Sequence, residues 1–369
     1  MFQAGDVLYG KLRPYLDKAV LAKESGICTT ELLVLRPKEG VDPRFLVGVV
    51  HAPAFIEHAV AGTTGVQHPR TSWGHIANFE IPAFDGEEQA KIADLLWEVH
   101  DAIASNEAAV EAGGDLKRAA MLALFSKGLR EGETRETGFG SVPEAWTETP
   151  LDDCSFVQTG AAKGRKFSDA EMLEVPYLRV ANVQDGHLDL TEMKEIRIRR
   201  SEIDRYRLQV GDVVLTEGGD FDKLGRGFIW RGELDLCVHQ NHVFAVRPNR
   251  DRLVPEFFAY LAQSPYGKAY FLKVAHKTTN LACINSTKLK AFPVPVPPTL
   301  DEQREIVAVL DAIDRKIDLH RRKRAVLDEL FKALLYKLMT GEIRVADLDL
   351  SALSSKPAPA AKPTAEVAA

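Results

Sequence analysis

The stretch Phe292-Pro293-Val294-Pro295, with Glu302-Gln303 and Ile306 after it, carries the chain from a β-like run into a long helical pattern. The first half contains the same arrangement as Phe79-Glu80-Ile81-Pro82, Glu88-Gln89 and Ile92. Two further motifs recur in the same order, Gly5-Asp6-Val7-Leu8 as Gly211-Asp212-Val213-Val214, and Leu35-Arg36-Pro37 as Val246-Arg247-Pro248. A repeat of roughly 200 residues is too long for a solenoid or propeller blade. The sequence therefore predicts a duplicated unit, in which each copy is a globular domain followed by a long helix.

The composition fits a protein with two domain-sized cores. The 369 residues are 45% hydrophobic and 27% charged, as in ordinary globular proteins. No run approaches a membrane-spanning length, and the N-terminus lacks the pattern of a signal peptide. The four cysteines stand far apart without a Cys-x-x-Cys pair. We therefore expect a cytoplasmic protein with reduced thiols and no membrane partner.

The net charge of −6 is unevenly distributed along the chain. Residues 151–297 hold 21 Lys and Arg against 19 Asp and Glu, whereas residues 86–150 hold 6 against 13. The acidity therefore lies on the first long helix and the residues after it. The mildly basic block 151–297 permits DNA binding without demonstrating it.

The order of strand-like and helical patterns predicts an α+β fold. In the second block the strand-like runs are 213–215, 227–230 and 242–246, and in the first a helix is expected to open at Pro43. The expected segments are a partial first β-rich domain (1–85), a first long helix (86–130), a linker (131–150), a second β-rich domain (151–297), a second long helix (298–341) and a disordered tail (342–369).

The two long helices share a heptad pattern. The apolar seams are Ile92, Leu96, Val99, Ile103, Asn106, Val110, Gly113, Lys117, Ala120 and Leu124, and Ile306, Leu310, Ile313, Ile317, His320, Arg324, Leu327, Phe331, Leu334 and Leu338. Matched seams of this length predict an antiparallel coiled coil, with polar Asn106 and His320 near its middle. The alternative is two amphipathic helices that lie on separate cores.

The run Arg321-Arg322-Lys323-Arg324 suggests a nucleic-acid contact at first sight. Four consecutive residues of a helix, however, point all round its axis. Pairing with Glu107 and Glu111 across the coiled coil is the favoured interpretation.

Signatures of catalysis are scarce in this sequence. It contains no Walker loop, and its glycines do not lie between a strand and a helix as a cofactor loop requires. Cys237, His239 and His242 have the residue types of metal ligands, but strand alternation places His242 on the opposite face from the other two. The sequence therefore predicts no catalytic residue, no cofactor and no metal.

Polar loops are the more informative feature. Thr63 to Arg70 corresponds to Lys277 to Cys283, and each loop lies just before the strand that leads into a long helix. Their Thr, Asn, Gln, Lys and Arg side chains can donate to phosphates and to base edges. The glycine-rich run Glu217 to Gly227 is a second polar loop of the second block. Solvated loops and a tight hairpin connection are the alternatives.

The whole chain resembles the specificity subunit of type I restriction–modification systems. The residues that carry the resemblance are Gly5 to Pro14, Val34 to Pro37, Glu80 to Pro82 and Glu88-Gln89 in the first half, and Gly211 to Val214, His239 to His242, Val294 to Pro298 and Asp301 to Arg304 in the second. The resemblance implies two target-recognition domains separated by a coiled coil of two long helices. Each domain would read one half of a bipartite site in the major groove of double-stranded DNA. It also implies a subunit that is no enzyme itself, and on which methyltransferase (modification) subunits and a motor-nuclease (restriction) subunit assemble.

The residues expected to face DNA lie in the polar loops and beside them. In the second block they are Arg165, Arg179, Asn182, Lys223, Arg226, Gln240, Asn241, Lys277, Thr278, Thr279 and Asn280. In the first block they are Lys11, Arg13, Thr63, Thr64, Gln67 and Arg70.

The two halves differ before their first shared motif. About 65 residues separate Trp146 from Gly211, whereas four precede Gly5. The first recognition domain therefore lacks its N-terminal portion in this sequence, either because Met1 is an internal start in a longer reading frame or because the subunit is truncated. We expect codons upstream of Met1 to encode about 60 further residues of this domain. Two functions follow as hypotheses. The chain directs a type I complex to a bipartite DNA site, or it is a remnant that acts only as a coiled-coil interaction protein for methyltransferase subunits.

Overall fold

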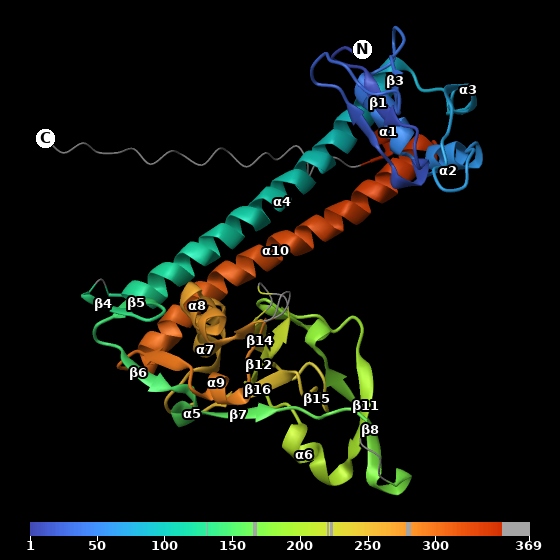
Figure 1. Cartoon of the computed structure of the whole chain (residues 1–369). Helices are drawn as coiled ribbons and strands as arrows, with labels where there is room; N and C mark the ends of the chain where they lie inside the picture. Colours follow the sequence, from blue (N-terminus) through green and yellow to red (C-terminus); the bar gives the residue numbers. More distant parts are fainter. Residues whose placement is uncertain (131, 165–167, 220, 222–223, 278–281, 349–369) are drawn as a thin grey trace, which may run out of the picture. The chain divides into compact units, whose positions relative to one another are not determined.

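The computed structural model describes residues 1–130, 132–164, 168–219, 221, 224–277 and 282–348 (Figure 1). The chain divides into two compact units, of which unit 1 comprises residues 1–108 with the chain from 320 onward, and unit 2 comprises residues 109–319. Both units combine helices with β-sheets, so the predicted α+β class is confirmed.

Unit 1 is built on a three-stranded antiparallel sheet. Strand β1 (Val7–Gly10) lies between β2 (Ala19–Leu21) and β3 (Leu32–Leu35), and the short helix η1 (Pro14–Leu16) lies in the β1–β2 connection. Three helices follow, α1 (Pro43–His51), α2 (Pro53–Ala61) and α3 (Trp73–Ile76). Pro43 opens α1 as predicted, and the carboxylate of Asp42 caps the helix by accepting from the N–H of Arg44 at 2.7 Å.

Unit 2 contains a larger form of the same arrangement. Its main sheet has the order β14-β12-β16-β7, with β12 (Val213–Thr216), β14 (Gly227–Ile229), β16 (Val243–Pro248) and β7 (Ser155–Thr159). The three strand-like runs expected in this block are therefore confirmed. The helices that follow are α7 (Pro255–Gln263), α8 (Pro265–Val274) and α9 (Ser286–Lys290).

The repeat extends to the pairing register of the strands. Val7 of β1 lies opposite Leu21 and Leu35, and Val213 of β12 lies opposite Ile229 and Val246. The recurring Gly-Asp-Val and Arg-Pro motifs thus mark the same positions of two homologous sheets.

Unit 2 also has elements that the described part of unit 1 lacks, most of them within residues 151–209. A second sheet has the order β11-β8-β15, with β8 (Met172–Leu178), β11 (Lys194–Arg199) and β15 (Val238–His239). The remaining elements are α5 (Leu151–Cys154), η2 (Asp169–Glu171), η3 (Val180–Asn182), β9 (Val183–Gln184), β10 (His187–Leu188), η4 (Arg200–Glu202) and α6 (Ile203–Tyr206).

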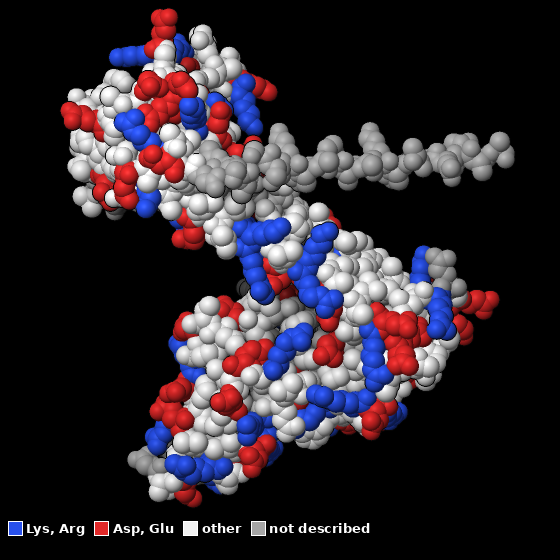
Figure 2. Space-filling view, turned by 180° about the vertical axis from the view of Figure 1, so that it is seen from behind, with Lys and Arg blue, Asp and Glu red and all other residues white. Residues whose placement is uncertain are grey.

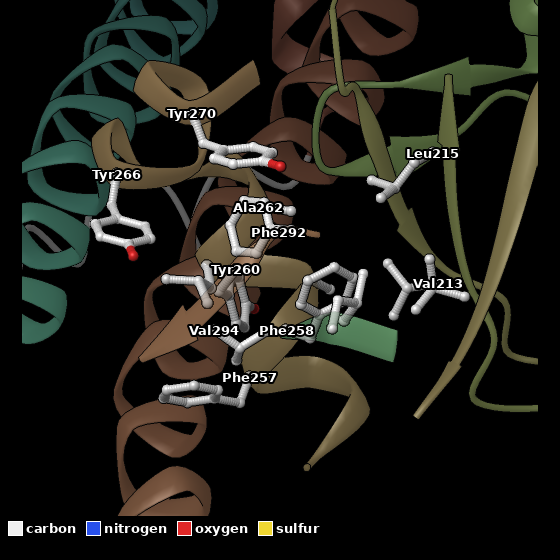
Figure 3. Close-up of a cluster of buried hydrophobic side chains, with 14 of the residues drawn as sticks. Val213, Leu215, Phe257, Phe258, Tyr260, Ala262, Tyr266, Tyr270, Phe292 and Val294 are labelled. Atoms are coloured by element: carbon white, nitrogen blue, oxygen red, sulfur yellow. The ribbon is translucent and has the colours of Figure 1, made fainter. Parts of the chain in front are cut away.

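Aromatic side chains fill the core of unit 2. Val213 and Leu215 of β12 project from the sheet toward α7, where Phe257 and Phe258 are fully buried (Figure 3). The ring of Phe258 meets that of Phe292 edge to face, with centroids 5.8 Å apart. Burying one such ring contributes about 1.5–3 kcal/mol, so this cluster fixes the sheet against the helices.

The two long helices are α4 (Gly86–Lys127) and α10 (Leu300–Met339). Each begins at a capping side chain, because Asp85 accepts from the N–H of Glu88 at 2.8 Å and Thr299 accepts from that of Glu302 at 3.2 Å. A glycine in the left-handed region, Gly128 or Gly341, follows the C-terminus of each helix. In the described part of the chain, no helix is long and apolar enough to cross a membrane.

The helices α4 and α10 pair in antiparallel orientation, as predicted. In unit 1, Nδ1 of His320 lies 2.8 Å from Oδ1 of Asn106, and Arg324 forms a salt bridge of 3.0 Å with Glu107. In unit 2, Ile317 packs against Gly113, and Lys117 pairs with Asp314 at 2.8 Å. Higher residue numbers on α4 meet lower numbers on α10, which defines the antiparallel direction.

The segment 131–150, expected as a linker, is instead part of unit 2. Its described residues form β4 (Thr134–Thr137), β5 (Gly140–Pro143) and β6 (Thr147–Pro150). Strand β6 pairs with β19 (Pro293–Val296), about 140 residues later in the chain, and Trp146 is buried in the core. The glycines and prolines of this segment favoured a linker, because the distant partner strand left no local signal. The last element described is η6 (Val345–Asp347) in unit 1.

Candidate nucleic-acid interface

A β-hairpin supplies the first polar loop of each unit. In unit 2, the glycine-rich run from Glu217 to Gly227 joins the antiparallel strands β12 and β14. In unit 1, residues 11–18 join β1 and β2 in the same way. The loop of unit 2 is therefore a hairpin connection, but a longer one than the tight hairpin considered as the alternative.

The second polar loop of unit 2 is hydrogen-bonded to the first. Strand β18 (Ala282–Cys283) pairs on one side with β13 (Gly218–Gly219) and on the other with β17 (His276–Lys277). A side chain at position 218 would place its Cβ 2.5 Å from the carbonyl oxygen of Ala282. Glycine at this position allows the two backbones to approach.

Unit 1 joins its two loops in a similar manner. The N–H of Arg13 donates to the carbonyl of Pro69 at 2.7 Å, and Leu12 forms a β-bridge with Arg70. Thr64 and Arg70 exchange two backbone hydrogen bonds of 3.0 Å, which close the second loop. We call the joined loops the loop platform, formed by residues 11–18 and 63–71 in unit 1 and by the described residues of 217–227 and 276–284 in unit 2.

Four of the predicted residues lie on or beside the platform of unit 2. Lys277 is exposed on β17. Arg226 is half-buried, and its Nη1 donates to Oε1 of Gln184 at 3.2 Å. Asn241 is half-exposed, and its Nδ2 lies 3.3 Å from Nε2 of His242. The neighbouring Gln240, also predicted, is half-exposed, and its N–H donates to the carbonyl of Leu178 at 2.9 Å.

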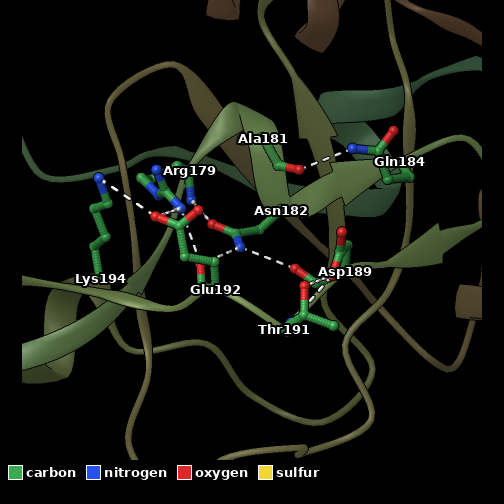
Figure 4. Close-up of polar contacts among 8 residues, drawn as sticks. All are labelled: Arg179, Ala181, Asn182, Gln184, Asp189, Thr191, Glu192 and Lys194. Carbon is green, nitrogen blue, oxygen red and sulfur yellow. Dashed lines mark hydrogen bonds and ion pairs between the residues drawn. The ribbon is translucent and has the colours of Figure 1, made fainter. Parts of the chain in front are cut away.

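Asn182 is buried and Arg179 is 19% exposed, and both side chains make hydrogen bonds within unit 2. Their assignment as DNA contacts stays a prediction. Asn182 is 3% exposed, and its Nδ2 donates to the carbonyls of Asp189 and Glu192 at 2.9 and 3.1 Å (Figure 4). Its Oδ1 accepts from the N–H of Arg179 at 3.0 Å, and Nη2 of Arg179 donates to the carbonyl of Glu192 at 2.9 Å. Both side chains therefore fix the turn between β8 and β11.

The basic residues of the unit 1 platform are partly engaged within the unit. Arg70 directs Nε and Nη2 at the carboxylate of Glu31, with a closest distance of 3.0 Å. Arg13 donates from Nη2 to the carbonyl of Gln67 at 3.4 Å. The hydrogen bond from Arg70 is the main cause of a lowered pKa of the Glu31 carboxyl. Lys11 is half-exposed, and its positive charge contributes to the same lowering.

The three uncharged candidates of unit 1 differ in their surroundings. Thr63 is half-buried, and its hydroxyl donates to the carbonyl of Val60 at 2.8 Å, which completes the end of α2. Thr64 and Gln67 are exposed on the second loop. The remaining candidates, Arg165, Lys223, Thr278, Thr279 and Asn280, lie outside the described residues.

Glu217 and His242 form a polar pair that the sequence did not predict. Nδ1 of His242 is hydrogen-bonded to the carboxylate of Glu217, and both residues flank the β13–β18 pairing. The backbone N–H of Glu217 also donates to the carbonyl of His242 at 2.9 Å, and the N–H of Ile284 donates to that of Glu217 at 2.8 Å. A polar residue directly follows the first hairpin strand in both units, Lys11 after β1 and Glu217 after β12. This recurrence was the sequence signal for a polar contact at Glu217.

The Cys237 and His239 side chains belong to the core. His239 is 1% exposed, its Nδ1 lies 2.6 Å from the carbonyl oxygen of Val243, and burial lowers its pKa. Burial also raises the pKa of the Cys237 thiol to about 12. Among the described residues, no three His, Cys, Asp or Glu side chains are grouped as metal ligands.

Charges of both signs are interspersed on the face of the units that Figure 2 shows. On this face, blue and red side chains lie side by side. Several charges are paired within their unit, as Lys268 is with Asp185 at 2.8 Å. The electrostatics therefore favour recognition by a few positioned side chains over attraction by a broad basic face.

Comparison with known proteins gives a consistent result. The family model described as type I restriction modification DNA specificity domain matches residues 143–329. The Methanocaldococcus jannaschii protein named type I restriction enzyme MjaX specificity subunit is 27% identical over 212 residues, which are 57% of this chain and 49% of that protein. The Escherichia coli EcoKI specificity subunit is 28% identical over 180 residues, 46% of this chain and 37% of that protein. The chain thus spans about half the length of the first relative.

Two solved structures share the fold. One, from a study of complex assembly and conformational transition of the type I R-M system, has a TM-score of 0.57 at 21% identity and covers 93% of this chain and 83% of its own. The other is the S subunit of a type I restriction-modification system from M. genitalium. It has a TM-score of 0.55 at 15% identity, and the match covers 92% of this chain and 84% of that one.

Proposed function

The chain belongs to the family of the type I restriction modification DNA specificity domain, and from this premise we propose that it is the sequence-specific DNA-binding subunit of a type I restriction–modification complex. Unit 2 reads one half of a bipartite site, and unit 1 carries the corresponding platform for the other half. Residues 151–297 act as the second recognition domain, and residues 1–85 act as a partial first one.

The observation that carries this proposal is the duplicated loop platform. In each unit two polar loops, distant in sequence, are held together by backbone hydrogen bonds on top of a rigid sheet. Polar and basic side chains placed on such a platform can donate to phosphates and to base edges. Duplicated platforms match a site with two halves.

The described side chains divide by chemistry. Lys277 is a phosphate contact, because an exposed ammonium binds phosphate as a point charge. Asn241 and Gln240 have amides that can pair with two atoms of an adenine in the major groove. Arg226 in unit 2 and Lys11, Arg13, Thr64, Gln67 and Arg70 in unit 1 complete the described set. Arg165, Lys223, Thr278, Thr279 and Asn280 are included by their sequence positions alone.

The remaining parts of the proposal concern the complex. The chain has no catalytic role of its own, and methyltransferase and motor-nuclease subunits assemble on it in the cytoplasm. The paired helices α4 and α10 are the natural scaffold for this assembly, since each is about 40 residues long and carries an exposed charged side. The described cysteines are free thiols, which suits a reducing compartment.

Binding selection on random duplexes with the full chain tests this function. The selected duplex is then titrated with wild type and variants at several salt concentrations. Lys277→Ala should weaken binding to all sequences and reduce the salt slope by about one. Asn241→Ala should relax specificity at one position, at a cost of about 1–3 kcal/mol. Lys332→Ala, which removes an exposed lysine of α10, is the matched control and should change neither quantity.

Two results would contradict the proposal in different ways. Selection of no preferred sequence, with retained capture of the modification subunit, would favour the remnant that acts only through its coiled coil. Selection of a sequence that Lys277→Ala and Asn241→Ala bind unchanged would leave the function in place and overturn the assignment of these residues.

A further inference from the structure

The hairpin loop of unit 1 contains an unusual backbone. Arg13 has φ of +51° and Asp17 has φ of +46°, and they are the non-glycine residues with positive φ in the described part of the chain. Such residues cost free energy and persist where the surrounding structure enforces them, often at functional sites. The two residues bracket η1, which consists of Pro14, Tyr15 and Leu16.

Several contacts hold this strained loop in place. Pro14 is buried, and the N–H of Arg13 is bound to the second loop of the platform through Pro69. The carboxylate of Asp17 lies 2.7 Å from Nδ1 of His51 on α1, and Nζ of Lys18 donates to the carbonyl of Leu12 at 2.8 Å. The loop is therefore a built structure with both ends anchored.

The anchored loop presents apolar side chains to solvent. Tyr15 is 55% exposed and Leu16 is 51% exposed. Single exposed apolar residues are common on protein surfaces, so exposure alone would carry no inference. Here the exposure is combined with a backbone that is strained on both sides of the exposed pair.

The position of Tyr15 is repeated in unit 2. Tyr15 is the fifth residue after the end of β1, and Phe221 is the fifth residue after the end of β12. Phe221 is 40% exposed in the corresponding hairpin loop. Both copies of the duplication thus carry an aromatic residue at the same sequence position after the first hairpin strand.

The charges around Tyr15 favour a nucleic acid over a protein as its partner. The acidic residues of the platform and its neighbourhood are paired, Asp17 with His51 and Glu31 with Arg70. Arg13 and Lys18 bind backbone carbonyls in the described part of unit 1, which leaves their positive charge uncompensated. An apolar ring between cations matches a groove of DNA, where the phosphates attract the cations and the bases accept the ring.

We propose that Tyr15 is a wedge that packs against an unstacked base step of the half-site bound by unit 1, and that Phe221 does the same in the half-site bound by unit 2. This inference rests on the DNA-binding function proposed above. The strained loop keeps the ring in place before binding, so that the ordering of the loop does not weaken the complex.

Fluorescence of 2-aminopurine tests the wedge. The duplex selected by the full chain is synthesised with 2-aminopurine at successive positions, and its fluorescence rises where a base is unstacked. We expect a rise at one step in each half-site on binding of wild type. Tyr15→Ala should abolish the rise in one half-site and weaken binding about tenfold. Tyr15→Phe should retain both effects, since the ring acts and the hydroxyl does not, and Phe221→Ala should abolish the rise in the other half-site.

The control is Tyr336→Ala, which removes a 48% exposed tyrosine from α10 and should leave the fluorescence unchanged. A selected duplex that shows no rise, or a rise that survives Tyr15→Ala, overturns the wedge and leaves the proposed function in place. A chain that selects no duplex overturns both. Loss of modification-subunit binding in Tyr15→Ala, with the DNA signal intact, identifies Tyr15 as a protein contact and also overturns the wedge.

Discussion

Arg247 donates two parallel hydrogen bonds to the carboxylate of Asp212, from Nε to Oδ1 and from Nη2 to Oδ2, each 2.8 Å long. The backbone N–H of Gln209 donates to the same carboxylate at 2.8 Å. Unit 1 repeats this arrangement, since Arg36 contacts Asp6 at 2.9 and 2.8 Å and the N–H of Gln3 donates at 2.8 Å. An ion pair of the same geometry thus joins the base of the first hairpin to the following strand in both units.

Asp212→Ala should therefore loosen the hairpin that supports the platform of unit 2. Asp212 is 1% exposed, and its removal leaves the N–H of Gln209 without an acceptor, at a cost of about 1–3 kcal/mol. Hydrogen exchange measured by mass spectrometry should show faster exchange in β12 and β16. The control Asp251→Ala removes an exposed carboxylate of the same unit and should leave the exchange of these strands unchanged.

The copy of this ion pair in unit 1 predicts an acid transition. The hydrogen bond from Arg36 lowers the pKa of Asp6 from 3.8 to about 2. Because the folded state has the lower pKa, the stabilisation is complete above pH of about 4 and is lost as the pH falls toward 2. Asp6→Asn should make the stability of unit 1 less dependent on pH in this window. Acid titrations followed by hydrogen exchange of β1 and β3 give the measurement, and an equal pH dependence in wild type and variant would contradict the assignment.

Much of the fold could be predicted because the same sequence motifs occur in both halves of the chain. The hairpin strands, the opening of α1 at Pro43 and the antiparallel α4–α10 pair all follow from local patterns that recur. The repeated Glu-Gln pair has a physical explanation in the structure. Gln303 accepts from the N–H of Val254 at 2.8 Å, and Gln89 accepts from that of Asp42 at 3.3 Å, so each glutamine holds the start of a helix against α10 or α4.

The features that the sequence did not predict depend mostly on contacts between residues far apart in the chain. Asn182 has the same amide whether it faces DNA or a buried turn, and its three hydrogen-bond partners are set by tertiary structure. Strand β6 depends on β19, which lies far along the chain. The Asp212–Arg247 pair could have been found, because the sequence repeats a carboxylate and a guanidinium at matching positions in both halves.

Two adjacent glycines of α4 should respond in opposite ways to alanine. A Cβ at Gly113 would lie 2.6 Å from Cγ1 of Ile317, whereas a Cβ at Gly114 meets its nearest atom, of Arg118, at 3.8 Å. Gly114→Ala should stabilise unit 2 by about 0.5–1 kcal/mol through helix propensity. Gly113→Ala gains the same propensity but forces the helices apart, at a cost of about 1–3 kcal/mol. Urea unfolding of the two variants should separate them, and equal stabilisation of both would contradict the close packing at Gly113.

Gly218→Ala should disconnect the two loops of the unit 2 platform without disturbing the core. The new Cβ would meet the carbonyl oxygen of Ala282 at 2.5 Å, so β13 and β18 must separate. We expect weaker DNA binding and faster exchange in residues 282–284, with unchanged exchange in β12. Gly114→Ala serves as the control for a glycine substitution elsewhere in unit 2. Retained binding with an intact β13–β18 pairing would show that this close approach is dispensable.

The contact between Asn106 and His320 should determine the register of the two long helices in unit 1. It replaces apolar packing at matched seam positions with one hydrogen bond of 2.8 Å, an exchange that usually costs stability and specifies the pairing. The double variant Asn106→Leu with His320→Leu should therefore unfold at a higher urea concentration. Because its seam has lost the polar pair, analytical ultracentrifugation should also reveal additional oligomers. Asn106→Leu alone should be less stable than the double variant, since His320 then lacks its partner. Ile103→Leu, an apolar exchange in the same seam, is the control and should cost less than about 1.5 kcal/mol with no change in oligomeric state. A double variant that stays monomeric and loses stability would assign the pair a supporting role instead of a role in register.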